Sequence, residues 1–183
     1  EVLGVHPFDI RAVTGDTDLT PVDLGSYSSR VTLMMGNAAI QAAERARDML
    51  ADAVARHLDL PKARLIFADR RVFDSEDTDR GVSFREAVCL AEAIFGTIGT
   101  VGSYTPPPSP ARFKGGGVGP SPTYSYTAAV VAVDVDPATG WITVPNIWVV
   151  HDIGCAINPT LARGQVEGSV YMALGEALME EQL

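Results

Sequence analysis

The 183-residue chain has few cysteines, histidines and aromatic residues, and it lacks any long apolar run. Its two cysteines, Cys89 and Cys155, form neither a CxxC motif nor a disulfide framework, which is typical of a reducing compartment such as the cytoplasm. The histidines, His6, His57 and His151, are too scattered to predict a zinc site. Since no window approaches the roughly 18 consecutive apolar residues of a membrane span, none is expected.

Basic residues are also in the minority, with 14 Lys and Arg against 23 Asp and Glu and a net charge of −9. This charge disfavours nucleic acid as a partner, because a nucleic-acid-binding surface needs basic side chains. The hydrophobic fraction of 46% is enough for a globular core. No signal peptide is visible at the start. Both ends resemble interrupted helical patterns, so we expect residues 1–183 to be one domain excised from a longer chain.

The first sixty residues predict a strand followed by a long helix. Residues 8–15 alternate between apolar and polar types and end at a glycine, which favours a strand. A helix is predicted over residues 29–58, where alanines recur at three- and four-residue spacing and permit close packing against another element. Gly36 costs this helix about 1 kcal/mol relative to alanine. A close backbone approach at Gly36 would explain that cost.

The next segment predicts a short hairpin and a second helix. Residues 64–68 and 71–73 are the expected strands of the hairpin. Ser83, followed three residues later by Glu86, forms the pattern of a capping box, which predicts a helix that ends near Gly96.

The remainder predicts an irregular stretch, a long hairpin and a final helix. Residues 99–118 are rich in glycine and proline, and their glycine run lacks the spacing of a phosphate-binding loop. Residues 127–136 and 141–151 are the predicted strands, joined by a turn. Asn158 and Pro159 suit the first positions of a helix that we expect to run to the end of the chain. Helices that alternate with antiparallel hairpins indicate an α+β fold.

Residues 25–30, Gly-Ser-Tyr-Ser-Ser-Arg, precede the long helix and are candidates for anion binding. Free amides and the positive dipole at a helix start attract phosphate. The hydroxyls add donors, and Arg30 can fork onto an anion. The simpler alternative is a loop in which Ser29 is an ordinary N-cap, and the residue types alone favour that alternative.

A second candidate segment, residues 151–159, leaves a strand and enters the final helix. His151 and Asp152 could form a catalytic pair, but no serine or cysteine nucleophile lies at a suitable spacing. The simpler alternative is that both side chains stabilise a tight turn, and the residue types favour it.

The final helix carries Gly164, Gly168 and Gly175, and each glycine destabilises it. Close contact with a ligand or another backbone would offset that cost. Between the first two glycines, Gln165 offers both a donor and an acceptor, which suits a pterin or nucleotide edge. The alternative is a buried helix packed tightly on the sheet.

Taken in order, these motifs resemble the molybdopterin-binding region of the xanthine dehydrogenase and aldehyde oxidase family. The resemblance covers nearly the whole chain and is weakest over residues 60–120. Its motifs lie at residues 15–18, 21, 25–30, 36–38, 132–137, 139–140, 151–154, 158–159 and 164–168.

The resemblance implies the molybdopterin-binding fold of the molybdenum hydroxylases, an antiparallel or mixed sheet with long packing helices. Within the family, residues 23–30 look most like the large subunit of 4-hydroxybenzoyl-CoA reductases. That likeness implies molybdenum on molybdopterin cytosine dinucleotide, a partner subunit with [2Fe-2S] clusters, and another with FAD and an added [4Fe-4S] cluster. The implied reaction reduces an aromatic CoA thioester, 4-hydroxybenzoyl-CoA, to benzoyl-CoA.

The resemblance also implies which residues touch the cofactor, and it assigns no catalytic residue or metal ligand to this chain. The family's catalytic glutamate lies in a later GxGE-type motif, which Gly175 and Glu176 do not match. Alternatives are a hydroxylase of aldehydes, purines, nicotinate or carbon monoxide, or a cofactor-free interaction module that docks through the alanine-rich helix. The implied cofactor contacts are Gly25, Ser26, Tyr27, Ser28, Ser29, Arg30, Ala156, Ile157, Asn158 and Gln165.

Overall fold

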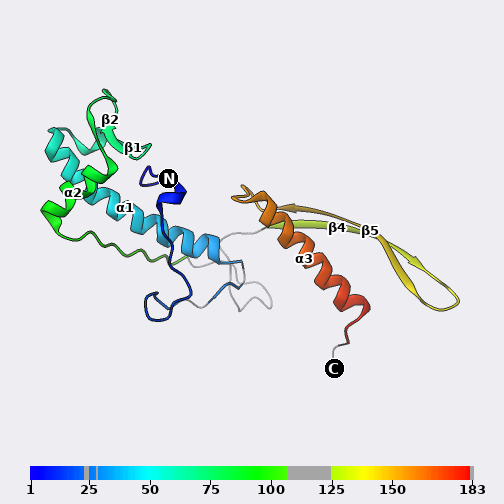
Figure 1. The fold of residues 1–183 in the computed structure, drawn as a ribbon. Helices are drawn as coiled ribbons and strands as arrows, with labels where there is room; N and C mark the ends of the chain where they lie inside the picture. Colours follow the sequence, from blue (N-terminus) through cyan, green and yellow to red (C-terminus); the bar gives the residue numbers. More distant parts are fainter. Residues whose placement is uncertain (23–24, 28, 107–124, 182–183) are drawn as a thin grey trace. The chain divides into compact units, whose positions relative to one another are not determined.

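The computed structural model describes residues 1–22, 25–27, 29–106 and 125–181 of the chain (Figure 1). The chain divides into two compact units, residues 1–106 and residues 107–183. The predicted α+β class is confirmed, because both units combine helices with antiparallel strands. That residues 1–183 form one domain stays a prediction.

The first unit holds two α-helices and a three-stranded antiparallel sheet of order β1-β2-β3. The predicted long helix and short hairpin are confirmed, whereas the third strand carries no strand pattern and was missed. The elements are η1 (Pro7–Asp9), α1 (Val31–Leu58), η2 (Lys62–Arg64), β1 (Leu65–Ala68), β2 (Arg71–Asp74), β3 (Gly81–Ser83) and α2 (Phe84–Phe95).

Local signals explain where the two helices begin and end. α1 ends at Asp59, which adopts a left-handed φ of 50° and donates its amide to the carbonyl of Ala55. α2 begins with the predicted capping box: Ser83 Oγ accepts from the Glu86 amide at 3.2 Å, and Glu86 Oε2 accepts from the Ser83 amide at 2.9 Å. α2 ends at Gly96, as predicted.

The core of the first unit lies between the second half of α1, the sheet and α2. No residue of α1 from 31 to 49 is buried, so the first half of this helix lies outside the core. The buried apolar residues are Leu50, Ala51, Ala53, Val54, Leu65, Phe67, Val72, Val82, Ala87 and Ala91.

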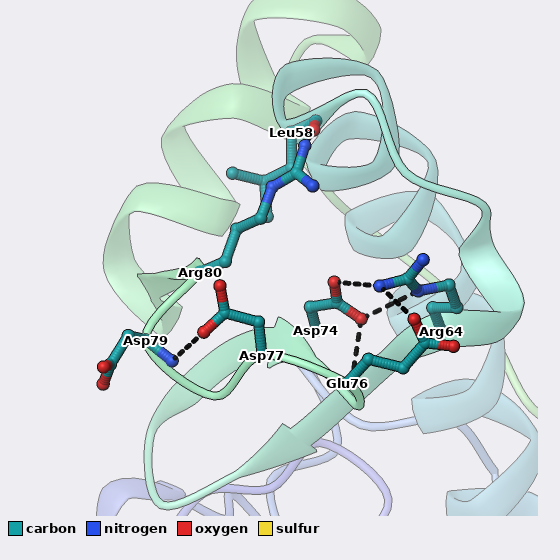
Figure 2. A network of polar contacts seen from close by, with 7 residues as sticks. All are labelled: Leu58, Arg64, Asp74, Glu76, Asp77, Asp79 and Arg80. Atoms are coloured by element: carbon teal, nitrogen blue, oxygen red, sulfur yellow. Dashed lines mark hydrogen bonds and ion pairs between the residues drawn. The ribbon is translucent and has the colours of Figure 1, made fainter.

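Asp74 is a buried carboxylate at the edge of this core, with its side chain only 1% exposed (Figure 2). Arg64 grips it with two bonds, Nε to Oδ1 at 2.9 Å and Nη2 to Oδ2 at 2.5 Å. The amide of Glu76 also donates to Oδ1 at 3.1 Å. The Arg64 guanidinium, together with this amide, holds the pKa of the Asp74 carboxyl below its ordinary value. The ion pair therefore satisfies the buried charge.

The predicted strand over residues 8–15 is wrong. The structure has the short 3-10 helix η1 there, capped by His6, and no strand up to residue 15. Phe8 is 93% exposed, so the alternating pattern does not face a core. Instead of pairing as a strand, the segment is held by Arg70, whose guanidinium forks onto the Asp9 carboxylate at 2.6 and 3.0 Å. That hydrogen bond lowers the pKa of Asp9.

The second unit contains β4 (Tyr126–Val135), β5 (Ile142–Asp152) and α3 (Pro159–Leu178). β4 and β5 form the predicted antiparallel hairpin, and Val130 lies opposite Trp148. Its turn is closed by Asp136, which accepts from the Ala138 amide at 2.9 Å and the Thr139 hydroxyl at 2.6 Å. α3 ends at Leu178, earlier than predicted.

The described part of the second unit has no buried residue. Both faces of the hairpin carry apolar side chains, because Val130, Trp148 and Val150 lie on one face and Val131 and Ile147 on the other. Trp148 is 54% exposed and Val150 is 74% exposed. Among the described residues, no helix is both long enough and apolar enough to cross a membrane.

Candidate cofactor-binding site

The first candidate segment is a turn that leads into α1. Gly25 has a φ of 97° and Ser29 a φ of 50°, so the backbone reverses within a few residues. The N-cap of α1 is Arg30, which makes no side-chain capping bond. The alternative in which Ser29 caps the helix is therefore wrong. The first amides of α1 point beyond the helix start and, with no capping bond from Arg30, suit an anion.

Arg30 holds this turn together. Its Nη1 donates to the carbonyl of Gly25 at 2.8 Å, and its guanidinium lies 5.1 Å from the centre of the Tyr27 ring. The Arg30 carbonyl accepts from the Met34 amide at 2.8 Å, which links the turn to the first helical residues. Ser26, Tyr27 and Ser29 are exposed in this turn, whereas Ser28 lies outside the described residues. The turn thus presents hydroxyls and one cation to solvent.

The second candidate segment joins β5 to α3. His151 Nδ1 lies 2.6 Å from the Thr127 hydroxyl across the hairpin, and Asp152 accepts from the Gly154 amide at 2.8 Å. The two side chains therefore have separate partners. This supports the interpretation that they stabilise local structure and argues against a catalytic pair.

The start of α3 matches its prediction. Asn158 Oδ1 accepts from the Leu161 amide at 3.0 Å, and Pro159 occupies the first helical position. Immediately before the cap, Ile157 is 84% exposed and Ala156 is half-buried. The two residues are therefore accessible beside a helix start.

Gln165 is exposed on α3, and its side-chain amide has no partner among the described residues. A Cβ on Gly164 or Gly168 would meet nothing within 4 Å. The structure therefore supplies no close protein backbone that would compensate these two glycines within the described part of the chain. The alternative of a buried helix packed on the sheet is wrong, because α3 has no buried residue.

The two candidate segments lie in different compact units of the chain. Their predicted convergence on one ligand stays a prediction. The glycine run at residues 115–119 lies outside the described residues. Within the described ranges, no cluster of three His, Cys, Asp or Glu side chains could hold a metal ion.

Sequence reasoning missed a contact beside the first segment. The expected close approach at Gly36 is wrong, because a Cβ there would meet no atom within 4 Å. The close approach instead occurs where Gly102 lies against α1 at Ala38 and Ala42. The predicted close packing of the alanines is confirmed at these two positions. The signal was present in the alanine spacing, but nothing local identified Gly102 as its partner.

Comparison with known proteins places the chain in a family. A family model described as a molybdopterin cofactor-binding domain matches residues 1–183. The chain is 32% identical, over 183 residues, to a probable hypoxanthine oxidase of Escherichia coli (strain K12), covering 99% of this chain and 18% of that protein. It is 29% identical over 197 residues to a putative xanthine dehydrogenase molybdenum-binding subunit of the same organism, covering 100% of this chain and 23% of that protein.

A solved structure has the same fold. Reconstituted CO dehydrogenase from Oligotropha carboxidovorans matches with a TM-score of 0.72 and 25% identity, over 91% of this chain and 20% of that chain. The chain thus spans about a fifth of the length of these relatives. The family match over all 183 residues agrees with the observed helices and antiparallel hairpins. The chain therefore belongs to the molybdopterin cofactor-binding domain family of the xanthine dehydrogenase and CO dehydrogenase type.

Proposed function

We propose that this chain binds the pterin and phosphate parts of a molybdenum cofactor within a larger oxidoreductase. The observation that carries the proposal is the start of α1, where the N-cap residue Arg30 makes no side-chain capping bond and follows a turn with exposed hydroxyl-bearing residues. Helix amides, hydroxyls and a guanidinium are the donors that a phosphorylated cofactor needs. The residues present therefore fit the group.

Each segment has a role in this proposal. Ser26, Ser28 and Ser29 donate hydroxyls to phosphate oxygens, and Arg30 balances their negative charge. Tyr27 and Gly25 complete the turn, since both contact Arg30. The bound cofactor supplies the redox chemistry of molybdenum, and the chain supplies position and hydrogen bonds.

The second segment would contact the remaining parts of the cofactor. Gln165 reads the polar edge of the pterin through its unpaired amide, which can both donate and accept. Ala156, Ile157 and Asn158 border the nucleotide tail, for which cytosine dinucleotide is the proposed form. The accessible positions of these residues support the proposal.

Molybdenum content tests the proposal in the full-length protein. Ser28→Ala and Gln165→Ala are expected to lower the molybdenum bound per subunit, because each removes a group that holds the cofactor. Ser169→Ala is the control, because it removes a polar group from the same helix but leaves the Gln165 side chain in place. The Ser169 hydroxyl donates to the backbone carbonyl of Gln165, at 2.9 Å. Unchanged molybdenum in both site variants would refute the assignment.

For the complete enzyme, the leading proposal is reduction of 4-hydroxybenzoyl-CoA to benzoyl-CoA, supported by the likeness of residues 23–30. Partner subunits with [2Fe-2S] clusters and with FAD and [4Fe-4S] would deliver the electrons, in the cytoplasm. Purine hydroxylation is the second candidate, and the 32% identity to a probable hypoxanthine oxidase favours it. Assays of the purified complex with 4-hydroxybenzoyl-CoA and with hypoxanthine separate the two substrates.

A further inference from the structure

After α2, residues 99–106 run back beside α1 toward its start (Figure 1). We call this segment the strap. From residue 100 to residue 106 its residues alternate strictly between half-buried and exposed, although it is not a strand. Such alternation is typical of an extended chain with one side against a surface. The surface is the first half of α1, which has no buried residue of its own.

Hydrogen bonds fasten the strap to this half of the helix. The Thr100 hydroxyl donates to the carbonyl of Ala42 at 2.8 Å. The Ser103 amide donates to Gln41 Oε1 at 3.4 Å. Arg45 donates from α1 to the carbonyl of Val101. The bonds connect strap residues to helix residues between 56 and 62 positions earlier in the chain.

Gly102 makes the closest approach in this contact. A Cβ at Gly102 would lie 1.8 Å from the Ala38 carbonyl oxygen and 2.8 Å from the Ala42 amide nitrogen. Both neighbours are helix backbone atoms, which cannot swing aside as a flexible side chain would. Any side chain at position 102 therefore has to push the strap away from α1. Gly99, by contrast, would place a Cβ in open space.

The contact is connected to the candidate cofactor site through the helix itself. Ala38 lies eight residues after Arg30, about 12 Å along an axis that rises about 1.5 Å per residue. Arg30 in turn holds the turn of residues 25–30 through its bonds to Gly25 and to the Met34 amide. A helix transmits a tilt along its length, so a shift at Ala38 moves this turn.

We propose that the strap fixes the direction of the first half of α1, and that Gly102 is a positioning residue for the cofactor-binding turn at residues 25–30. The proposal rests on the proposed function of that turn. Gly102 itself is not a cofactor contact. It acts by allowing the strap to lie directly on the helix backbone.

The test uses the full-length protein with Gly102→Ala and the matched control Gly99→Ala. We expect Gly102→Ala to retain less than half of the molybdenum per subunit of the unchanged protein, and Gly99→Ala to retain all of it. Hydrogen exchange of peptides from residues 31–42 and 50–58 is the second readout. Exchange is expected to speed up in residues 31–42 and to stay unchanged in residues 50–58.

Gln165→Ala serves as the reference variant, because it is expected to lose cofactor while the strap stays unchanged. If exchange over residues 31–42 rises no further in Gly102→Ala than in Gln165→Ala, the strap does not fix the helix and the inference fails. Full molybdenum retention by Gly102→Ala also overturns it. In that case, molybdenum loss by Ser28→Ala would leave the proposed function standing, whereas retention by Ser28→Ala and Gln165→Ala as well would remove both.

Gly102→Ala could unfold the first unit as a whole, in which case hydrogen exchange would also be faster in residues 50–58. A second variant then tests the inference. Thr100→Val keeps the side-chain volume and removes only the bond to the Ala42 carbonyl. Faster exchange confined to residues 31–42, with reduced molybdenum, supports the inference. Unchanged exchange and full molybdenum in Thr100→Val overturn it.

Discussion

Replacing Asp74 tests how much a buried ion pair contributes to the stability of the first unit. It is buried, and the fork from Arg64 and the amide of Glu76 satisfy its charge. A buried carboxylate that keeps its charge needs such partners, and removing the charge leaves the cation facing a weaker acceptor. The pair therefore fixes the end of β2 against the 3-10 helix that precedes β1.

We expect Asp74→Asn to lower the midpoint of urea unfolding clearly. The cause is loss of the charge that Arg64 grips on both oxygens. Asp77→Asn is the control, because Asp77 is exposed and accepts one bond from the Asp79 amide, which an asparagine oxygen can also accept. Equal midpoints for the two variants would show that the buried pair contributes nothing.

Asp74 and two other carboxylates of the first unit predict how its stability depends on pH. Asp74 and Asp9 have pKa values held below the ordinary 3.8 by hydrogen bonds from Arg64 and Arg70, respectively, and the Ser83 amide lowers the pKa of Glu86 from 4.5. Each group binds its proton less tightly in the folded state. Its stabilisation is therefore complete above the unfolded value and is lost as the pH falls through the folded pKa.

Urea midpoints measured from pH 7 downward should thus stay level with respect to these groups until about pH 5 and fall below pH 4. Asp74→Asn is expected to reduce the slope of this acid limb. A slope that is the same with and without the Asp74 carboxyl would contradict the assignment.

Among the elements, α2 has the best-defined start. Ser83→Ala removes the acceptor for the Glu86 amide and is expected to destabilise the first unit by about 1 kcal/mol. Glu86→Gln should cost less, since glutamine preserves the reciprocal bond of the capping box. Ser75→Ala is the matched control, because Ser75 is exposed and caps no helix. Urea unfolding of the three variants measures the difference, and a loss in Ser75→Ala as large as in Ser83→Ala would contradict it.

Elements with local signals could be predicted from the sequence. The Ser83 and Glu86 pair, the turn at Asp136 and the Asn158 cap each depend on residues a few positions apart. The strand prediction for residues 8–15 was wrong because a strand needs a partner strand. An alternating pattern does not show whether such a partner exists. The candidate site divides in the same way: residue types made residues 25–30 a candidate, and their contact with a cofactor stays a prediction, whereas the contact of Gly102 with Ala38 depends on the fold.

At the scale of the whole molecule, the two units differ in what stabilises them. The first unit has a core shared by α1, the sheet and α2, whereas no described residue of the second unit is buried. Burial of apolar surface is the main driving force of folding. The second unit therefore lacks, within its described residues, the contacts that would fold it by itself.

Separate expression of the two units tests this difference. We expect residues 1–106 to unfold cooperatively in urea and residues 125–183 to show no cooperative transition, because only the first has a core. Circular dichroism across a urea titration is the measurement. A sharp transition in residues 125–183 would show that the hairpin and α3 are self-sufficient.

The hairpin of β4 and β5 has a consequence for how a cell makes this protein. Among the described residues each of these strands has one edge without a paired strand, and valines and a tryptophan are accessible on the faces of the hairpin. Ribbons of this kind pair with one another readily, which is the first step of aggregation. We therefore expect newly made chains to bind chaperones that prevent aggregation. We also expect the yield of soluble recombinant protein to improve when expression is slowed at low temperature.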